Sequence, residues 1–216
     1  MQTAQNRVCL RGRVAAGPAF SHTSHGVAYH MFSLAARRLS GAEDVVRVLA
    51  SAPLLAQCPC AEGQTVAVEG SLRSFNNKST QGSRLVITVL ARTLTPGEGP
   101  DENQIFLSGA LCKPPVYRAT PLGREICDLI LAVNRSYGRA DYLPCIVWGA
   151  GARQCEACAV GSRLALEGRL QSRAYIKLVD GVQTHRVAYE VSVSQVTAPE
   201  PDEPAPKNFA PPRILS

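Results

Sequence analysis

The feature that most constrains this chain is an internal duplication. Three segments of the first half return in the second half in the same order, 97 or 98 residues later: 6–12 at 103–109, 34–41 at 131–138, and 66–74 at 164–172. A period near 100 residues is the size of one small domain and is much longer than a solenoid repeat. The 216 residues therefore predict two domains of one fold, and differences between the two copies point to function.

Each copy is rich in runs where apolar and polar residues alternate, which is typical of strands with one face on a core. Val66 and Val68 lead to Gly70 in the first copy, and Leu164 and Leu166 lead to Gly168 in the second. A glycine inside a strand usually marks a bulge or sharp bend, which a small closed barrel needs. The sequence thus predicts strongly bent strands in both copies.

The only stretches that favour a helix are short and rich in alanine and cysteine. They lie at 53–61 and 150–159, between the third and fourth expected strands, and Gly63 and Gly161 end them. Five strands with one helix in that place are typical of an OB-fold, a five-stranded Greek-key barrel. We therefore predict an all-β chain with two tandem OB-folds at 1–97 and 103–197, a linker at 98–102 and a disordered, proline-rich tail at 198–216.

Charge and hydropathy narrow the class of partner. The net charge is +6, and each repeat carries more Lys and Arg than Asp and Glu, which favours a polyanionic partner. No run approaches the ~18 apolar residues of a membrane span, and the N-terminus lacks a signal-peptide layout, so we expect a cytoplasmic protein without a membrane partner.

The eight cysteines leave two interpretations open. Cys58 with Cys60 and Cys155 with Cys158 fall at equivalent places in the two repeats, but each pair supplies only two of the four ligands of a structural zinc site. The alternative is reduced, mostly buried thiols. We expect no cofactor. The chain also lacks a Walker loop, a Gly-x-Ser-x-Gly motif and a His-Glu-x-x-His motif, so we expect no enzymatic activity.

Ordered motifs in the second repeat resemble the bacterial single-stranded DNA-binding protein family over almost all of 103–197. They begin at Asn103 and Gly109, continue through 131–135 and 146–149, and end with 166–175 and 189–191. The first repeat resembles the family less well. The resemblance implies sequence-independent binding of single-stranded DNA, which is coated and protected during replication, recombination and repair.

The resemblance also implies the residues of a binding site. The family stacks bases on aromatic side chains at positions that match Tyr137, Tyr142, Trp148 and Tyr175. The cations expected to contact phosphates are Arg118, Arg124, Arg135, Arg139, Arg169, Arg173 and Lys177. From the residues alone, the indole of Trp148 can pack inward or outward. Phe106 and Tyr189 take part in the apolar alternation of their expected strands, so we expect them in the core.

The first repeat lacks most of this aromatic set. Ser40, Val45 and Ser51 stand at the positions of Tyr137, Tyr142 and Trp148. Weaker contacts to single-stranded DNA are expected from Arg37, Arg38, Arg73, Phe75 and Arg84. The alternative for these arginines is an ordinary solvated surface.

Three expectations concern partners. The family works as four OB-folds together, so a chain with two is expected to form a homodimer. The resemblance also implies that the protein acts at the bacterial nucleoid. Replication and repair proteins are possible partners, although the chain ends at 211–216 without the acidic tip through which the family recruits them. The alternatives are a primosomal or recombination accessory that loads a partner on single strands, and a protein–protein scaffold whose aromatic residues lie in the cores.

Overall fold

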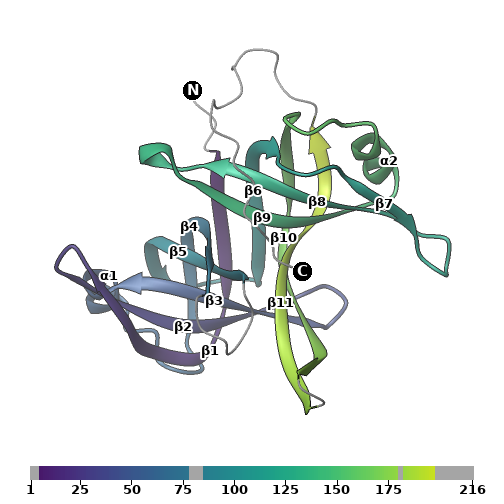
Figure 1. Cartoon of the computed structure of the whole chain (residues 1–216). Coiled ribbons are helices and arrows are strands. Elements are labelled where there is room, and N and C mark those ends of the chain that lie inside the picture. Colours follow the sequence, from purple (N-terminus) through teal and green to yellow (C-terminus); the bar gives the residue numbers. More distant parts are fainter. Residues whose placement is uncertain (1–4, 78–84, 180–181, 198–216) are drawn as a thin grey trace. The chain divides into compact units, whose positions relative to one another are not determined.

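The computed structural model describes residues 5–77, 85–179 and 182–197 (Figure 1). In the first repeat the elements are β1 (Asn6–Ser24), β2 (Val27–Arg37), β3 (Glu43–Ser51), α1 (Ala52–Gln57), β4 (Thr65–Asn76) and β5 (Leu85–Pro96). β1 pairs antiparallel with both β2 and β4, and β4 pairs antiparallel with β5. β3 pairs antiparallel with β2 and parallel with β5, so the five strands close into a barrel.

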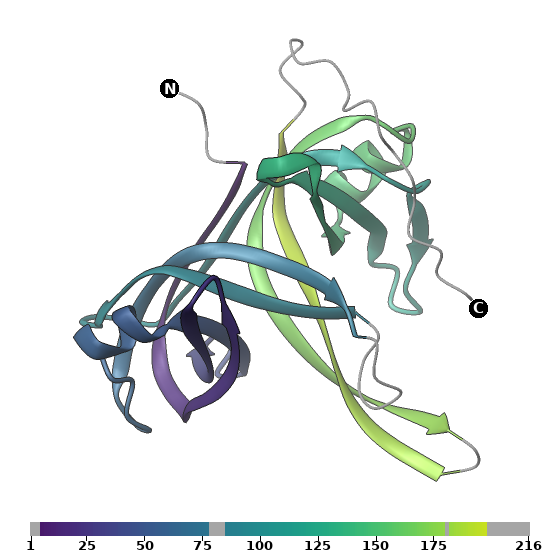
Figure 2. The ribbon, with the colours of Figure 1, turned by 60° about the vertical axis from the view of Figure 1, so that its left-hand side comes forward.

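The second repeat has the same order of elements with its first strand in two pieces. They are β6 (Glu102–Leu111), β7 (Val116–Ala119), β8 (Glu125–Asn134), the 3-10 turn η1 (Ser136–Gly138), β9 (Ala140–Trp148), α2 (Ala150–Glu156), β10 (Arg163–Val179) and β11 (Val182–Thr197). β8 pairs antiparallel with β6, β7 and β9, and β9 pairs parallel with β11. β10 and β11 run side by side as long strands (Figure 2).

These two barrels, each with one helix between its third and fourth strands, confirm the predicted fold class of two tandem OB-folds. Gly63 and Gly161 follow the helices and adopt positive φ of 85° and 92°. The tail predicted at 198–216 lies outside the described residues. Neither helix in the described part of the chain is long and apolar enough to cross a bilayer.

By compactness the chain divides into two units. One comprises Asn6–Ile105 with Arg169–Glu190, and the other comprises Phe106–Gly168 with the end of β11 from Val191. The outer part of β10 and β11 therefore groups with the first barrel. The domain limits at 1–97 and 103–197 follow the sequence repeats, and we retain them as a proposal.

The core of each barrel follows the predicted alternation. Val66, Val68, Leu164 and Leu166 are all at most 3% exposed. Phe106, which the same pattern placed in the core, is instead half-buried, because its neighbours Ile105 and Leu107 occupy the core-facing positions of β6. Tyr189 is also half-buried, so the core prediction was wrong for both.

An asparagine at the start of each repeat joins the first strand to the fourth. The Asn6 side chain donates to the Leu72 carbonyl at 2.9 Å and accepts from the Leu72 N–H at 2.8 Å. Asn103 makes the same two bonds with Leu170, at 2.7 Å and 3.0 Å. Each carboxamide thus pairs as a backbone peptide would, and it satisfies backbone groups in a strongly bent region.

Four glycines mark the places where strands cross most closely. A Cβ on Gly12 would lie 2.2 Å from the Ala35 carbonyl oxygen, and one on Gly70 would lie 2.2 Å from the Leu90 oxygen. At the equivalent Gly109 and Gly168 the distances are 2.4 Å and 2.3 Å. Backbone cannot give way as a flexible side chain can, so these positions admit only glycine. The bends predicted from glycine-containing strands are therefore backbone-on-backbone contacts.

We predict that Gly12→Ala lowers the free energy of unfolding by about 3 kcal/mol, because the new methyl group overlaps the Ala35 carbonyl. The control is Gly17→Ala in the same strand. Its Cβ would meet nothing nearer than the Cys60 oxygen at 3.9 Å, so it should change stability by no more than about 0.5 kcal/mol. Thermal and denaturant unfolding measure both, and equal losses would contradict the steric explanation.

Candidate nucleic-acid interface

The outward side of β8 and β9 carries two of the predicted stacking residues. Along β9, Asp141, Leu143, Cys145 and Val147 are at most 2% exposed and face the core. Tyr142 and Trp148 occupy the alternate positions with Pro144 and Ile146, so they point to the opposite side. We call this side of β8 and β9 the outer face of the second barrel.

Trp148 ends β9 and pairs across the sheet with Ile126 of β8. Its side chain is 40% exposed, whereas Ile126 is buried. Gly149 follows with a positive φ of 60° and turns the chain into α2. The indole is therefore held on a rigid strand end with part of its surface open to solvent, as a base-stacking side chain requires.

The other two predicted stacking residues lie outside β9. Tyr137 lies in η1, where the N–H of Arg135 donates to the Arg139 carbonyl at 2.7 Å, and its side chain lies outside the described part of the structure. Tyr175 lies on β10, is half-buried, and belongs to the compact unit of the first barrel. Of the four, the structure places only Tyr142 and Trp148 on one face.

One predicted phosphate contact is already neutralised by a buried carboxylate. The Arg135 guanidinium forms a bidentate pair with Asp141, with Nε donating to Oδ2 at 2.6 Å, and the Asp141 side chain is fully buried. Arg38 and Asp44 form the same pair 97 residues earlier, with Nε and Oδ2 at 2.7 Å. Hydrogen bonding to Asp44 raises the pKa of Arg38. For Arg38 and Arg135 the structure thus favours a role in holding the turn after the second strand.

The remaining predicted cations differ in whether a carboxylate lies close to them. Arg118 pairs with Asp128 at 2.9 Å, with both side chains about half exposed, and Arg169 lies 4.0 Å from Asp44. None of the ion pairs among the described residues involves Arg124, Arg139 or Arg173, and all three are exposed. These three are the strongest candidates for phosphate contacts. The Lys177 side chain lies outside the described part of the structure.

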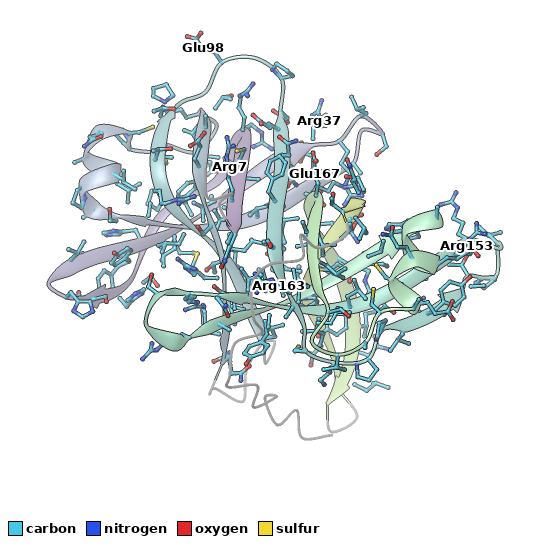
Figure 3. The ribbon with its side chains drawn as sticks, turned by 90° about the horizontal axis from the view of Figure 1, so that it is seen from above. Arg7, Arg37, Glu98, Arg153, Arg163 and Glu167 are labelled. Carbon is cyan, nitrogen blue, oxygen red and sulfur yellow. The ribbon has the colours of Figure 1, made fainter. Side chains whose placement is uncertain are left out.

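The cations predicted in the first barrel are mostly engaged. Arg37 is exposed, projects from the end of β2 (Figure 3) and lies 3.5 Å from Glu43. Arg73 is half-buried and makes contacts of its own, and Phe75 is 51% exposed. Arg84 lies outside the described residues.

The outer side of β3 is contacted by β10 and β11. The Val45 N–H donates to the Ser172 hydroxyl at 3.3 Å, and the Arg47 guanidinium lies 5.8 Å from the centre of the Tyr189 ring. Asp44 accepts from the Ser172 N–H at 3.3 Å in addition to its pair with Arg38. Val45 stands where the second repeat has Tyr142, so this part of the first barrel is occupied by protein.

The sequence interpretation missed two features of the site. The Arg–Asp pairs have a signal in the sequence, since both span six residues around a turn and recur at the repeat interval. The other is a group of aromatic and histidine side chains on β1 and β2, namely Phe20, His22, Tyr29 and His30. Only the strand register between β1 and β2 brings these four side chains together.

All eight cysteines are free, and seven are buried. Burial raises the pKa of the Cys60 thiol and of the Cys155 thiol to about 12, so both stay protonated at neutral pH. Among the described residues no group of three or more His, Cys, Asp or Glu side chains is arranged to hold a metal ion. The thiols pack as small apolar side chains.

Comparisons with known proteins agree with this geometry. The profile of the Single-strand binding protein family matches residues 102–198. Single-stranded DNA-binding protein B of Bacillus subtilis is 33% identical over 110 residues, which are 48% of this chain and 96% of that protein. Single-stranded DNA-binding protein 1 of Staphylococcus aureus is 38% identical over 80 residues, which are 34% of this chain and 48% of that protein.

A solved structure extends the likeness to both barrels. The wild-type single-stranded DNA binding protein from Thermus aquaticus has a TM-score of 0.74 at 27% identity, covering 94% of this chain and 96% of that one. A deletion mutant of the same protein gives a TM-score of 0.76 and covers 96% of this chain. The barrels, the outward aromatic pair on β9 and these likenesses together place the chain in the single-strand binding protein family.

Proposed function

We propose that this chain binds single-stranded DNA without reading its base sequence and coats strands exposed during replication, recombination and repair. The observation that carries the proposal is the outer face of the second barrel, where Tyr142 and Trp148 point away from a well-packed core. An aromatic pair held outward on a rigid strand supplies faces on which unpaired bases can stack. The relatives named for binding single-stranded DNA support the same ligand.

The mechanism needs only stacking and charge. Bases stack on the rings of Tyr142 and Trp148. Every base has a π-face that can stack in this way, so binding does not depend on the base sequence. Phosphates lie near Arg124, Arg139 and Arg173, whose guanidiniums are exposed. Tyr137, Tyr175, Arg118, Arg169 and Lys177 remain proposed contacts with single-stranded DNA. The chain acts by binding and not by catalysis, and we place it at the bacterial nucleoid.

The two alternatives are less favoured. A scaffold that had lost nucleic-acid binding would bury its aromatic residues, whereas Trp148 is 40% exposed. No observation among the described residues favours an accessory that loads a partner on single strands.

The function is tested by titrating the protein with oligo(dT) and following Trp148, the one tryptophan of the chain. Each cation that displaces counterions from a single strand contributes about −0.7 to the salt slope. Three such arginines predict a roughly twentyfold loss of affinity between about 50 and 200 mM salt. Affinity that does not change with salt, or equal binding of a duplex, would contradict the proposal.

Stacking and charge are separated by two sets of variants. Trp148→Ala with Tyr142→Ala should weaken oligo(dT) binding at least tenfold, about 1.4 kcal/mol, with an unchanged salt slope. Arg124→Ala with Arg139→Ala should instead flatten the slope. Val160→Ala removes an apolar side chain that is 52% exposed outside the strands, and it serves as the control that leaves both quantities unchanged. Anisotropy of a labelled oligonucleotide measures all three.

We propose in addition that the chain is a homodimer. Its support is the duplication, which supplies two of the four barrels that the family uses together. Analytical ultracentrifugation at micromolar concentration should give about twice the chain mass of 23.1 kDa. A stable monomer at that concentration would rule the dimer out.

A further inference from the structure

The first barrel has a hairpin that the second repeat lacks in this form. β1 runs unbroken over 19 residues and pairs with β2 to its end, where Ser24 faces Val27. His25 and Gly26 make the two-residue turn, with φ of 47° and 77°, as a type I′ hairpin turn requires. In the second repeat the corresponding strand is interrupted between Leu111 and Val116.

Four ring side chains lie on this hairpin in two pairs. His22 and Tyr29 stack with centroids 5.3 Å apart and planes 9° from parallel. Phe20 and His30 meet edge to face, 5.8 Å apart with planes at 79°. A register shift between Phe20 and His22 gives each of the consecutive residues Tyr29 and His30 its own ring partner.

The stacked pair lies on the side of the sheet that matches the outer face of the second barrel. Phe32 and Leu34 of β2 are at most 1% exposed and face the core, so Tyr29, at an odd position, faces outward. Across the sheet Tyr29 pairs with Ser51, and the equivalent pair in the second barrel is Ile126 with Trp148. At this level the first barrel therefore has an aromatic ring on its second strand, whereas the second barrel has one on its third strand.

We propose that the stacked His22–Tyr29 pair is a base-stacking surface for single-stranded DNA on the first barrel. The proposal rests on the proposed function and adds a site in a repeat whose matched positions hold serine and valine. His22 is exposed and Tyr29 half-buried, so the face of the imidazole away from Tyr29 is open to a base. Imidazole and phenol rings are both known platforms for unpaired bases.

Charge around the pair suits a polyanion better than a basic protein partner. Residues 1–42 contain no Asp or Glu. The nearest acids on β3, Glu43 and Asp44, face Arg37 and Ala36 at the far end of the β2–β3 pairing, and Asp44 is neutralised by Arg38. Because Val45 and Arg47 are contacted by Ser172 and Tyr189, the end at Tyr29 is the part of this outward side left for a strand.

The proposal is tested by moving the one tryptophan of the chain. Tyr29→Trp in a Trp148→Phe background places the fluorophore in the proposed site, and saturating poly(dT) should quench it by at least a third. Thr93→Trp in the same background is the control, since Thr93 is exposed on β5 opposite Glu69, and its fluorescence should stay unchanged. Saturation removes any effect of the Trp148 replacement on affinity.

The affinity of full-length variants for poly(dT) gives a second test of the proposed site. His22→Ala with Tyr29→Leu should weaken poly(dT) binding at least threefold, and His22→Phe with Tyr29→Phe should restore it. Thr93→Ala should have no effect, and thermal unfolding verifies that each variant is folded.

The outcomes separate the two proposals. If the unaltered chain does not bind poly(dT), the proposed function fails. If it binds and quenches Trp148, but a tryptophan at 29 is not quenched and the His22 and Tyr29 variants bind as before, only the new site is overturned. In that case the ring pairs would belong to a protein interface instead.

Discussion

Both barrels depend on backbone lying directly on backbone at two crossings. Gly12 and Gly70 in the first barrel, and Gly109 and Gly168 in the second, leave less than 2.5 Å between a would-be methyl group and a carbonyl oxygen. Because the first and fourth strands can bend there, five strands close around a small core. The asparagine at the start of each repeat then pairs the peptide groups that bending would leave unsatisfied. A rigid barrel is what allows an outward aromatic ring to be held in place.

The sequence predicted the barrels well because the repeat gives each pattern twice. Apolar alternation around Gly70 and Gly168 marked the same strand in both copies, and the helices fell where the alanine-rich stretches lay. The failures concern which side of a strand faces the core. Phe106 and Tyr189 were assigned to the core by local alternation. Alternation divides a strand into two sets of residues, but it does not say which set faces the core.

The cations show the same limit more sharply. A basic residue in the sequence is a phosphate contact only if no carboxylate reaches it first, and Asp141 reaches Arg135 from the next strand. The ring pair of His22 and Tyr29 depends on a register shift that no composition argument reveals. By contrast, the outward position of Trp148 follows from one buried neighbour, Val147, once β9 is known to be a strand. Contacts within a strand were predictable, and contacts between strands were not.

The duplicated Arg–Asp pair carries a further meaning when it is compared with the aromatic residues. The pair is kept in both copies, while the residues at the positions of Tyr137, Tyr142 and Trp148 differ. In an assembly of identical subunits every substitution appears in all barrels at once. A fused tandem lets selection act on one barrel while its sister preserves the activity. One chain can thus acquire a new surface on one barrel without changing the other, and its two halves record separately what folding requires and what the ligand requires.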